Sequence, residues 1–374
     1  MLLRAICGCV LLGILAAGLW PFHSPRNGVR WLSRGNGFLF SNYGSVVSAG
    51  SFPDRSSEVD PPCSVEIWLQ PKWVHAPGAI LAFYRRDRRV TPFLMRQSAS
   101  GDLVLQRTSP DQPHPTQRVR IRADDLFGRQ KPVLLSISAN RAGTTIYADG
   151  VLVKTFADFS LSATNLTGQL ILGNSPVTTD DWTGTLRGLA IYDRDLTAGE
   201  VSEHYADWTN RRQSKLAAAA VALYLFDEGA GNIVHNHLDA ATDLLIPERF
   251  FILQAEFLKR PWDEFHQSWS YWLDLVINVA GFIPFGFCFY AYFSRQGRFD
   301  HPIAATMAFG FAVSMTIEVL QAFLPTRHSG MTDLITNTLG TALGALALRL
   351  AAVQAVLAKA ELWAGHPRPT ANRL

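Results

Sequence analysis

Two related phrases in the C-terminal third of the chain place acidic and amide side chains at a spacing that suits a binding or catalytic site. The first phrase is Asp274-Leu-Val-Ile-Asn278 and the second is Asp333-Leu-Ile-Thr-Asn337. An aspartate and an asparagine four residues apart lie on the same face of a helix. Both phrases fall in runs apolar enough to cross a membrane, where a polar side chain is costly and needs a partner or a function.

A further apolar run lies between the two phrases and ends in more polar residues. Glu318 and Gln321 are spaced to share one helix face, and Arg327 follows in the next loop. Interhelical hydrogen bonds and close glycine packing are one explanation of such residues, and a functional site is the other. The candidate polar cluster comprises Asp274, Asn278, Glu318, Gln321, Arg327, Asp333 and Asn337.

The elements that position this cluster are predicted to be membrane helices. Three hydrophobic runs, at 272–293, 302–324 and 331–353, each have about the 20 residues that a spanning helix needs. Residues 2–20 form another apolar run, and no convincing small-residue cleavage site follows it. We therefore expect an uncleaved helix at 1–22 and a membrane domain at 272–353, with about four transmembrane helices in all.

The distribution of basic residues predicts the orientation of these helices. The loop at 294–300 carries Arg295 and Arg298, and the tail at 354–374 carries further basic residues. By the positive-inside rule, both termini and this loop are expected in the cytoplasm. The polar cluster then lies near the outer leaflet, and the region between the first two crossings lies outside the cytoplasm.

That intervening region, at 28–240, reads as an all-β sandwich. Residues 64–70 alternate polar and apolar side chains, which is typical of a half-buried strand. Asp149-Gly150 separates two β-rich runs and predicts a tight hairpin. Residues 241–271 mix aromatic and charged side chains, so we expect an interfacial connector there.

Composition limits the other possibilities. A net charge of +3 in 374 residues is too small to indicate nucleic-acid binding. Cys63 is the single cysteine of the β region, so no disulfide framework is expected. No metal-ligand spacing is present, and no cofactor is predicted; Asp180 and Asp181 are weak candidates for a calcium site, with solvated turn residues as the preferred interpretation.

Two arginine clusters in the β region could form a surface for an anionic ligand. Residues that recur at period two share one face of a strand. The alternative explanation is solubility and protection of an edge strand. The two clusters comprise Arg85, Arg86, Arg88, Arg89, Arg118, Arg120 and Arg122.

The β region also resembles a known family. Thr-Gly-Thr-Leu-Arg-Gly-Leu-Ala-Ile-Tyr-Asp-Arg-Asp-Leu-Thr-Ala-Gly-Glu-Val at 183–201 is similar to the closing segment of concanavalin A-like (laminin G-like) jelly rolls. The strand at 64–71 and the hairpin at 147–150 fit that family in its order. This resemblance implies a fold used by lectins, adhesion modules and glycanases. Glycosidases need paired carboxylates, and Glu66 has no acidic neighbour two or four positions away, so hydrolysis is not favoured.

The membrane region carries a second resemblance. Residues 274–286, Glu318 and Gln321, Arg327, and residues 333–337 are similar in order and spacing to the VanZ-like membrane family. Members are small multi-helix membrane proteins, and the name-giving one is linked to glycopeptide resistance. The resemblance implies a location in the bacterial cytoplasmic membrane, with a jelly roll inserted after the first transmembrane helix, and it implies no defined reaction.

Three functions remain open from the sequence. The first is a cell-envelope protein, embedded in the lipid bilayer, whose jelly roll binds an envelope glycan or protein ligand. The second is a membrane enzyme or a handler of lipid-linked glycans or lipid headgroups that uses Glu318, Asp274 and Asp333. The third is a structural or assembly factor. Missing hydrolase and metal motifs favour a protein that is not an enzyme, whereas the polar cluster favours the second function.

Overall fold

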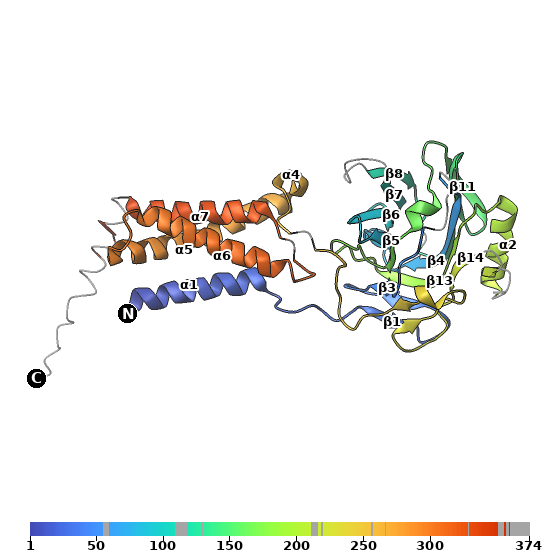
Figure 1. Cartoon of the computed structure of the whole chain (residues 1–374), viewed down its shortest axis with the longest axis horizontal. Helices are drawn as coiled ribbons and strands as arrows, with labels where there is room; N and C mark the ends of the chain where they lie inside the picture. The colour runs from blue at the N-terminus through green and yellow to red at the C-terminus, as the bar shows by residue number, and fades with distance from the viewer. Residues whose placement is uncertain are drawn as a thin grey trace, which may run out of the picture. The chain divides into compact units, whose positions relative to one another are not determined.

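The computed structural model describes residues 1–350 except 55–59, 109–117, 129, 211–215, 218–219, 256, 266 and 328, and also describes 355, 356 and 359. The chain divides into two compact units, drawn in Figure 1. The helical unit comprises Met1–His23 and Ala255–Leu374, and the β unit comprises Ser24–Gln254. Most of the tail expected at 354–374, with Arg368 and Arg373, lies outside the described residues, as does His328.

The β unit consists of two antiparallel sheets. The first sheet contains, in spatial order, β1 (Val29–Trp31), β2 (Phe38–Phe40), β13 (Gly184–Tyr192), β4 (Cys63–Pro71), β9 (Val133–Asn140), β10 (Gly143–Ala148) and β11 (Val151–Phe156), with β14 (Ala220–Tyr224) also paired to β13. The second contains β15 (Ile233–Val234), β16 (Leu244–Leu245), β3 (Val46–Ser48), β12 (Gln169–Leu172), β5 (Gly78–Arg85), β6 (Val90–Gln97), β7 (Leu103–Thr108) and β8 (Arg118–Ala123).

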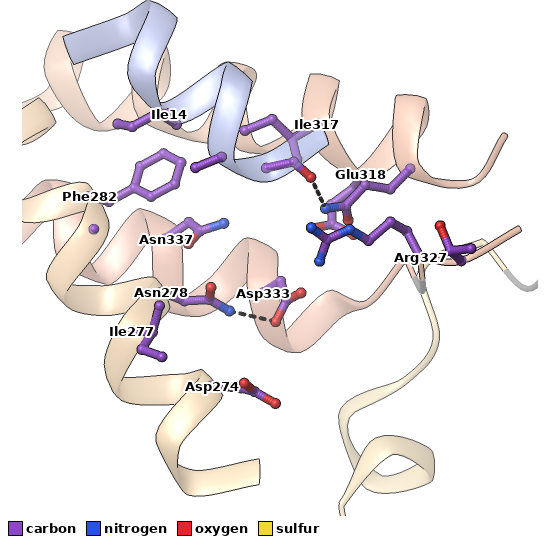
Figure 2. A pocket seen from close by; sticks show the side chains of 15 residues that line it. Ile14, Asp274, Ile277, Asn278, Phe282, Ile317, Glu318, Arg327, Asp333 and Asn337 are labelled. Carbon is purple, nitrogen blue, oxygen red and sulfur yellow. Dashed lines mark hydrogen bonds between the residues drawn. The ribbon is translucent and has the colours of Figure 1, made fainter. Parts of the chain in front are cut away.

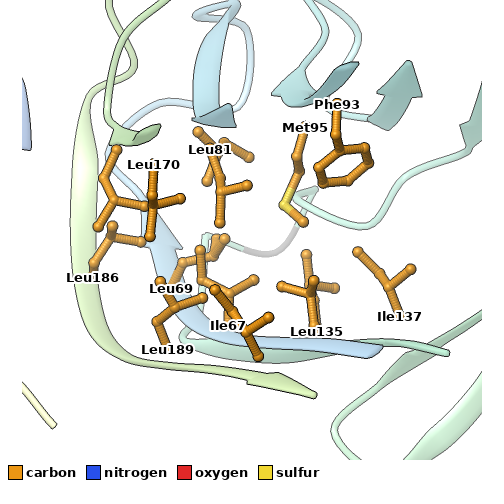
Figure 3. Packing of buried hydrophobic residues seen from close by; sticks show 14 of the residues in the cluster. Ile67, Leu69, Leu81, Phe93, Met95, Leu135, Ile137, Leu170, Leu186 and Leu189 are labelled. Carbon is orange, nitrogen blue, oxygen red and sulfur yellow. The ribbon is translucent and has the colours of Figure 1, made fainter. Parts of the chain in front are cut away.

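The core lies between the two sheets because their strands alternate inward and outward side chains. On β4, Ile67 and Leu69 point inward and are fully buried. Figure 3 shows them facing Leu81 and Met95 of the second sheet. Two sheets whose inner side chains interdigitate in this way form a sandwich, which confirms the predicted all-β fold of this region.

The segments singled out in the β sequence form regular elements. β10 and β11 pair as an antiparallel hairpin around Asp149 and Gly150, both of which have positive φ (52° and 80°). Left-handed φ at both turn residues is what a tight hairpin requires. β13 is followed by the helix α2 (Ala198–Thr209), whose first turn is closed by a capping box between Thr197 and Glu200.

The β unit is longer than the expected 28–240. β16 pairs with β3, and Phe250 donates a backbone hydrogen bond to the carbonyl of Pro25. These contacts attach residues 241–254 to the sandwich, so only the second half of the expected connector belongs to the helical unit. That half contains the short helix α4 (Pro261–Glu264). The 3₁₀ turns of the β unit are η1 (Ala163–Leu166) and η2 (Ala240–Thr242).

The helical unit is a bundle of α1 (Leu2–Leu19), α5 (Trp269–Gln296), α6 (Pro302–Gln321) and α7 (Met331–Arg349) (Figure 1). Among the described residues, α1, α5 and α6 are the three helices long and apolar enough to cross a membrane. Helix α7 has 19 residues and falls short because of its polar side chains, Asp333 and Asn337 among them. Its most extensive helix contact is with α5.

Glycines bring α5 and α7 into backbone contact. A Cβ atom on Gly344 would lie 2.0 Å from the Ile283 carbonyl oxygen, and one on Gly340 would lie 2.2 Å from the carbonyl oxygen of Val279. Small residues at such crossings are typical of membrane helices. These contacts also fix the direction of the pair: α5 and α7 run parallel, so the two Asp/Asn phrases start at the same end of the bundle.

Candidate functional site

All seven residues of the predicted polar cluster line one cavity in the helical unit. The cavity has a volume of about 490 Å³ and is bounded by residues from α1, α5, α6, α7 and the loop that joins α6 to α7. Figure 2 shows Asp274 and Asn278 on one side, Asp333 and Asn337 on a second, and Glu318 with Arg327 on a third. Helices α5, α6 and α7 and the loop after α6 thus contribute polar side chains to one cavity.

The two phrases are joined directly. Asn278 Nδ2 donates a hydrogen bond to Asp333 Oδ1 at 2.7 Å (Figure 2). Asp274 lies one helical turn before Asn278 and has an exposed side chain. Asn278 therefore contacts α7, whereas Asp274, one turn earlier on α5, lies at the exposed end of the cavity.

Glu318 is held at the start of α7. Its side chain is 1% exposed, and Oε2 accepts a hydrogen bond from the backbone N–H of Gly330 at 2.8 Å. Gly330 is the N-cap residue of α7. Because a helix N-terminus carries unpaired N–H groups and partial positive charge, a carboxylate is stable there. Glu318 thus positions α7 in addition to lining the cavity.

Gln321 and Arg327 bind the C-terminal end of α1. Gln321 Nε2 donates to the Gly18 carbonyl at 2.7 Å. Arg327 Nε donates to the Trp20 carbonyl at 2.9 Å, and Nη2 of the same guanidinium also contacts that oxygen. The last carbonyls of a helix have no intrahelical partner, so these side chains satisfy groups that are costly to leave unpaired in a membrane.

Three polar atoms of cavity-lining residues have no hydrogen-bond partner among the described protein groups. They are Gln321 Oε1, Asn337 Oδ1 and Thr326 Oγ1. Gln321 and Asn337 are 7% and 5% exposed. Asn337 Nδ2 is already used, since it donates to Ser314 Oγ at 3.0 Å. Buried polar groups in native proteins are usually hydrogen-bonded, so water or a bound group would be expected to supply donors to these oxygens.

The cavity combines polar and apolar walls. Its lining carries the carboxyl groups of Asp274, Glu318 and Asp333 and the guanidinium of Arg327. Its apolar lining residues are Ile14, Ala17, Ile277, Phe282 and Ile317. Along α5 the order is Asp274, Ile277, Asn278 and Phe282, so polarity falls with distance from the start of the helix. Such a gradient suits an amphiphilic ligand.

Sequence reasoning missed Glu264. Its Oε2 accepts a hydrogen bond from the backbone N–H of Thr332 at 3.3 Å and also contacts the Thr332 hydroxyl. A Cβ atom on Gly330 would lie 1.9 Å from Glu264 Oε1, so the Glu264 carboxylate lies directly against the Gly330 backbone. The sequence feature that could have indicated Glu264 is its position as an acidic residue at the end of a short helix that begins with proline, shortly before the first Asp/Asn phrase.

The predicted arginine surface is only partly supported by the geometry. β8 is an edge strand, and Arg120 and Arg122 are exposed on it; the side chain of Arg118 lies outside the described part of the chain. Arg122 forms an ion pair with the buried Asp102, and Arg85 pairs with Asp87 at 2.9 Å. The remaining members, Arg86, Arg88 and Arg89, lie at the β5–β6 turn. Arg88 also lies 4.0 Å from Asp87, so three of the six arginines whose side chains are described are paired with neighbouring carboxylates.

The acidic candidates of the β unit have protein partners. Glu66 is fully buried beneath α2 and accepts hydrogen bonds from Ser136, Tyr192, His204 and Trp208 at 3.0–3.1 Å. Asp180 pairs with Arg96 at 3.0 Å, and Asp181 Oδ1 accepts from Asn174 at 2.6 Å. Among the described residues, no group of three or more His, Cys, Asp or Glu side chains is placed to hold a metal ion.

A second hollow lies on the outer face of the second sheet. Its volume is about 200 Å³, and it lies over β6 and β7 beside the loop at 175–180. Arg96 and Asp180 form one wall, and burial raises the pKa of Asp180 against the opposing effect of Arg96. The polar residues that line the hollow are Thr91, Arg96, Gln106, Thr108, Ser175, Thr178 and Asp180.

Family models match both units of the chain. Residues 44–202 match the concanavalin A-like lectin/glucanases superfamily, and residues 215–352 match the VanZ/LLP1 family. The chain joins a concanavalin A-like domain to a VanZ-like domain. The VanZ match begins inside the β unit, where β14 pairs with β13, so the structural boundary at Gln254 lies within the matched range. Since the described part of the chain has three helices long and apolar enough to span a bilayer, this is a membrane-associated protein with a lectin-like fold.

Solved structures with local similarity include botulinum neurotoxin domains. The receptor binding domain of the C/D mosaic serotype has 13% identity and a TM-score of 0.36, covering 48% of this chain and 45% of that chain. The serotype D ligand binding domain in complex with N-acetylneuraminic acid has 14% identity and a TM-score of 0.37, covering 48% and 45%. The chain thus spans less than half the length of these structures. No curated protein matches the chain.

Proposed function

We propose that this protein resides in the bacterial cytoplasmic membrane, where its VanZ-like domain holds the polar headgroup of an envelope lipid or lipid-linked glycan. The observation that carries the proposal is the pair of buried, unpartnered amide oxygens on Gln321 and Asn337 in a cavity with polar and apolar walls. A purely packed bundle gains nothing from such groups, since an unsatisfied buried acceptor costs about 1–3 kcal/mol.

The proposed orientation places the cavity at the outer leaflet and the concanavalin A-like domain outside the cytoplasm. Exposed aromatic side chains support this depth, because tryptophans collect at membrane interfaces. Trp20 ends α1, Trp269 begins α5 and Phe323 follows α6, and these side chains are 65%, 81% and 80% exposed. All three belong to the end of the bundle that carries the polar cluster.

The concanavalin A-like domain has a separate proposed role, which is to bind the glycan part of the envelope. Its family includes lectins, and the hollow over β6 and β7 is lined mostly by hydroxyl, amide and charged side chains. Arg96 and Asp180 are already fixed by their ion pair, so they offer a preformed donor and acceptor to sugar hydroxyls. The alternative of an enzyme at Glu318, Asp274 and Asp333 has no comparable supporting feature beyond the cluster itself.

Ligand retention tests the membrane part of the proposal. The full chain is reconstituted in nanodiscs made from a bacterial membrane lipid extract, and bound molecules are counted by native mass spectrometry. We expect retention by the wild type and loss in Gln321→Leu and Asn337→Leu. Thr316→Val is the control, since Thr316 is exposed on α6 and bonds only within its helix, to Ala312. Equal retention in all four proteins would reject the site.

Cysteine labelling tests the orientation. Ser270 and Ser294 lie near opposite ends of α5, and both are exposed. In intact spheroplasts, a membrane-impermeant thiol reagent is expected to label Ser270→Cys, and to label Ser294→Cys only after permeabilisation. The wild-type chain serves as the background control for the native cysteines. The reverse pattern would place the cavity at the inner leaflet and contradict the proposal.

A further inference from the structure

Two of the three unpartnered polar atoms of the cavity are amide oxygens, which can only accept, and the third is the Thr326 hydroxyl. The Gly18 carbonyl can only accept, so Gln321 must present Nε2 to it, and this leaves Oε1 facing no described protein donor. Asn337 Nδ2 donates to Ser314 Oγ, and its Oδ1 faces no described protein donor. The exposed carboxylate of Asp274 adds further acceptor capacity at the opening. A ligand that matches these groups must bring donors.

Two of the donor side chains that line the cavity bind protein oxygens. Arg327 donates to the Trp20 carbonyl through two of its nitrogens. Asn278 donates to Asp333.

The charges of the cavity act in the same direction. Three carboxyl groups, those of Asp274, Glu318 and Asp333, line it together with the single guanidinium of Arg327. Like charges repel strongly where water is scarce, so an anionic group is disfavoured and a cation is favoured. Among the described residues, no group of three or more His, Cys, Asp or Glu side chains is placed to hold a metal ion, so we infer an organic cation.

We propose that the group bound in this cavity is a primary ammonium, which supplies positive charge and three N–H donors. Gln321 Oε1, Asn337 Oδ1 and the Asp274 carboxylate are its acceptors. The apolar residues Ile14, Ile277 and Phe282 extend from the polar end and would contact the apolar part of the same molecule. This inference rests on the proposed function and narrows it to one class of headgroup. The ammonium could be carried by an aminophospholipid or by a soluble amine.

Two phospholipids that differ only in the headgroup nitrogen provide the test. Phosphatidylethanolamine carries three N–H donors, whereas phosphatidylcholine carries a cation with none. The full chain is reconstituted in nanodiscs with equal amounts of both lipids, and the lipids that remain bound are counted by native mass spectrometry. We expect at least a tenfold preference for phosphatidylethanolamine. The preference should fall several-fold in Asp274→Asn and remain in the control Thr316→Val.

Further measurements show whether the ammonium comes from a lipid or from a soluble amine. They also separate failure of the ammonium inference from failure of the proposed function. Competition by free ethanolamine or glucosamine at millimolar concentration would assign a soluble amine as the ligand. Equal retention of the two phospholipids, or preference for phosphatidylcholine, would overturn the ammonium inference. If the ammonium inference failed but Gln321→Leu still lost the bound lipid, the proposed headgroup site would stand and only the ammonium assignment would be rejected. If no variant changed retention of any lipid, the proposed function would fail as well.

Discussion

Asn278 Nδ2 lies 2.7 Å from Asp333 Oδ1, so the asparagine of one Asp/Asn phrase binds the aspartate of the other. The repeat in the sequence is therefore also a contact in space. Because α5 and α7 run parallel, equivalent positions of the two phrases lie at similar depths in the bundle. The other members of the phrases, Asp274 and Asn337, line the same cavity.

A double-mutant cycle on this pair measures how strongly the phrases are coupled. Asn278→Ala and Asp333→Ala are each expected to lower the stability of the full chain, and the double variant should lose less than their sum. Interhelical hydrogen bonds in membranes contribute about 0.6 kcal/mol on average and ~1.7 kcal/mol at most. Denaturant unfolding in mixed micelles measures the coupling. Strict additivity would show that the bond makes no net contribution.

Glycine substitutions test the close approach of α5 and α7. Gly344→Ala places a methyl group 2.0 Å from the Ile283 carbonyl oxygen, so the helices must separate. We expect a loss of about 1–3 kcal/mol, the usual effect of overpacking a core. Gly13→Ala on α1 is the matched control, because no described atom lies within 4 Å of the position that its added methyl group would take. A smaller loss in Gly344→Ala than in the control would contradict the packing described here.

The contact between Arg327 and α1 can be tested by hydrogen exchange. In Arg327→Ala the Trp20 carbonyl loses its side-chain donors, so the last turn of α1 should open more often. A net loss of ~1 kcal/mol corresponds to about fivefold faster exchange of amides at 16–20. Arg298→Ala, in the exposed loop at the other end of the bundle, is the control. Unchanged exchange would mean that α1 is held by its apolar contacts alone.

The buried Glu66–His204 pair gives the concanavalin A-like domain a pH-dependent stability. The pKa of His204 is raised above its usual value. Burial and the charge of Arg194 lower this pKa, but the hydrogen bond and charge of Glu66, together with the charge of Glu200, raise it by more. Tyr192 contacts both residues. The folded domain therefore binds the proton more tightly than the unfolded chain. This stabilisation is complete below about pH 6.5 and is lost as the pH rises through the folded-state pKa.

Hydrogen exchange of α2 in the full chain measures this effect, after correction for intrinsic exchange rates. Protection of the 198–209 amides is expected to fall as the pH rises through that range. His204→Gln should remove the dependence, since glutamine donates to Glu66 without titrating. A pH dependence of the same size in His204→Gln would assign it to another group.

Local pattern predicted much of the architecture. The strand β4, the Asp149-Gly150 hairpin and the polar faces of α5 and α7 all follow from the spacing of neighbouring residues. Strand β4 was expected to be half-buried, but its first five residues are all buried because α2 covers Glu66 on the outer face. The ends of the helices differ from the expected bounds because capping residues and turns set them, and hydrophobic periodicity does not indicate these features. Ser268 starts α5 earlier than the expected residue 272, and α6 ends at Gln321 before the turn that contains Pro325.

The parts that could not be predicted depend on contacts between distant segments. Gln321 and Gly18 are 303 residues apart in the chain, and Glu66 and His204 are 138 apart. Nothing in the local sequence indicates that a glutamine will bind the end of a helix from the other terminus. Glu264 was missed for the same reason, because its importance depends on the position of Gly330 beneath it.

The polar cavity is either a ligand site or a packing feature, and Asp274→Asn separates the two most directly. If the site is built for a donor-rich ligand, the substitution relieves repulsion among the three carboxylates that line the empty cavity and also weakens binding. We predict that the melting temperature of the delipidated full chain rises by about 2–4 °C for ~1 kcal/mol of relief, while ligand retention falls. A lower melting temperature with unchanged retention would show that Asp274 is structural and would contradict a ligand site.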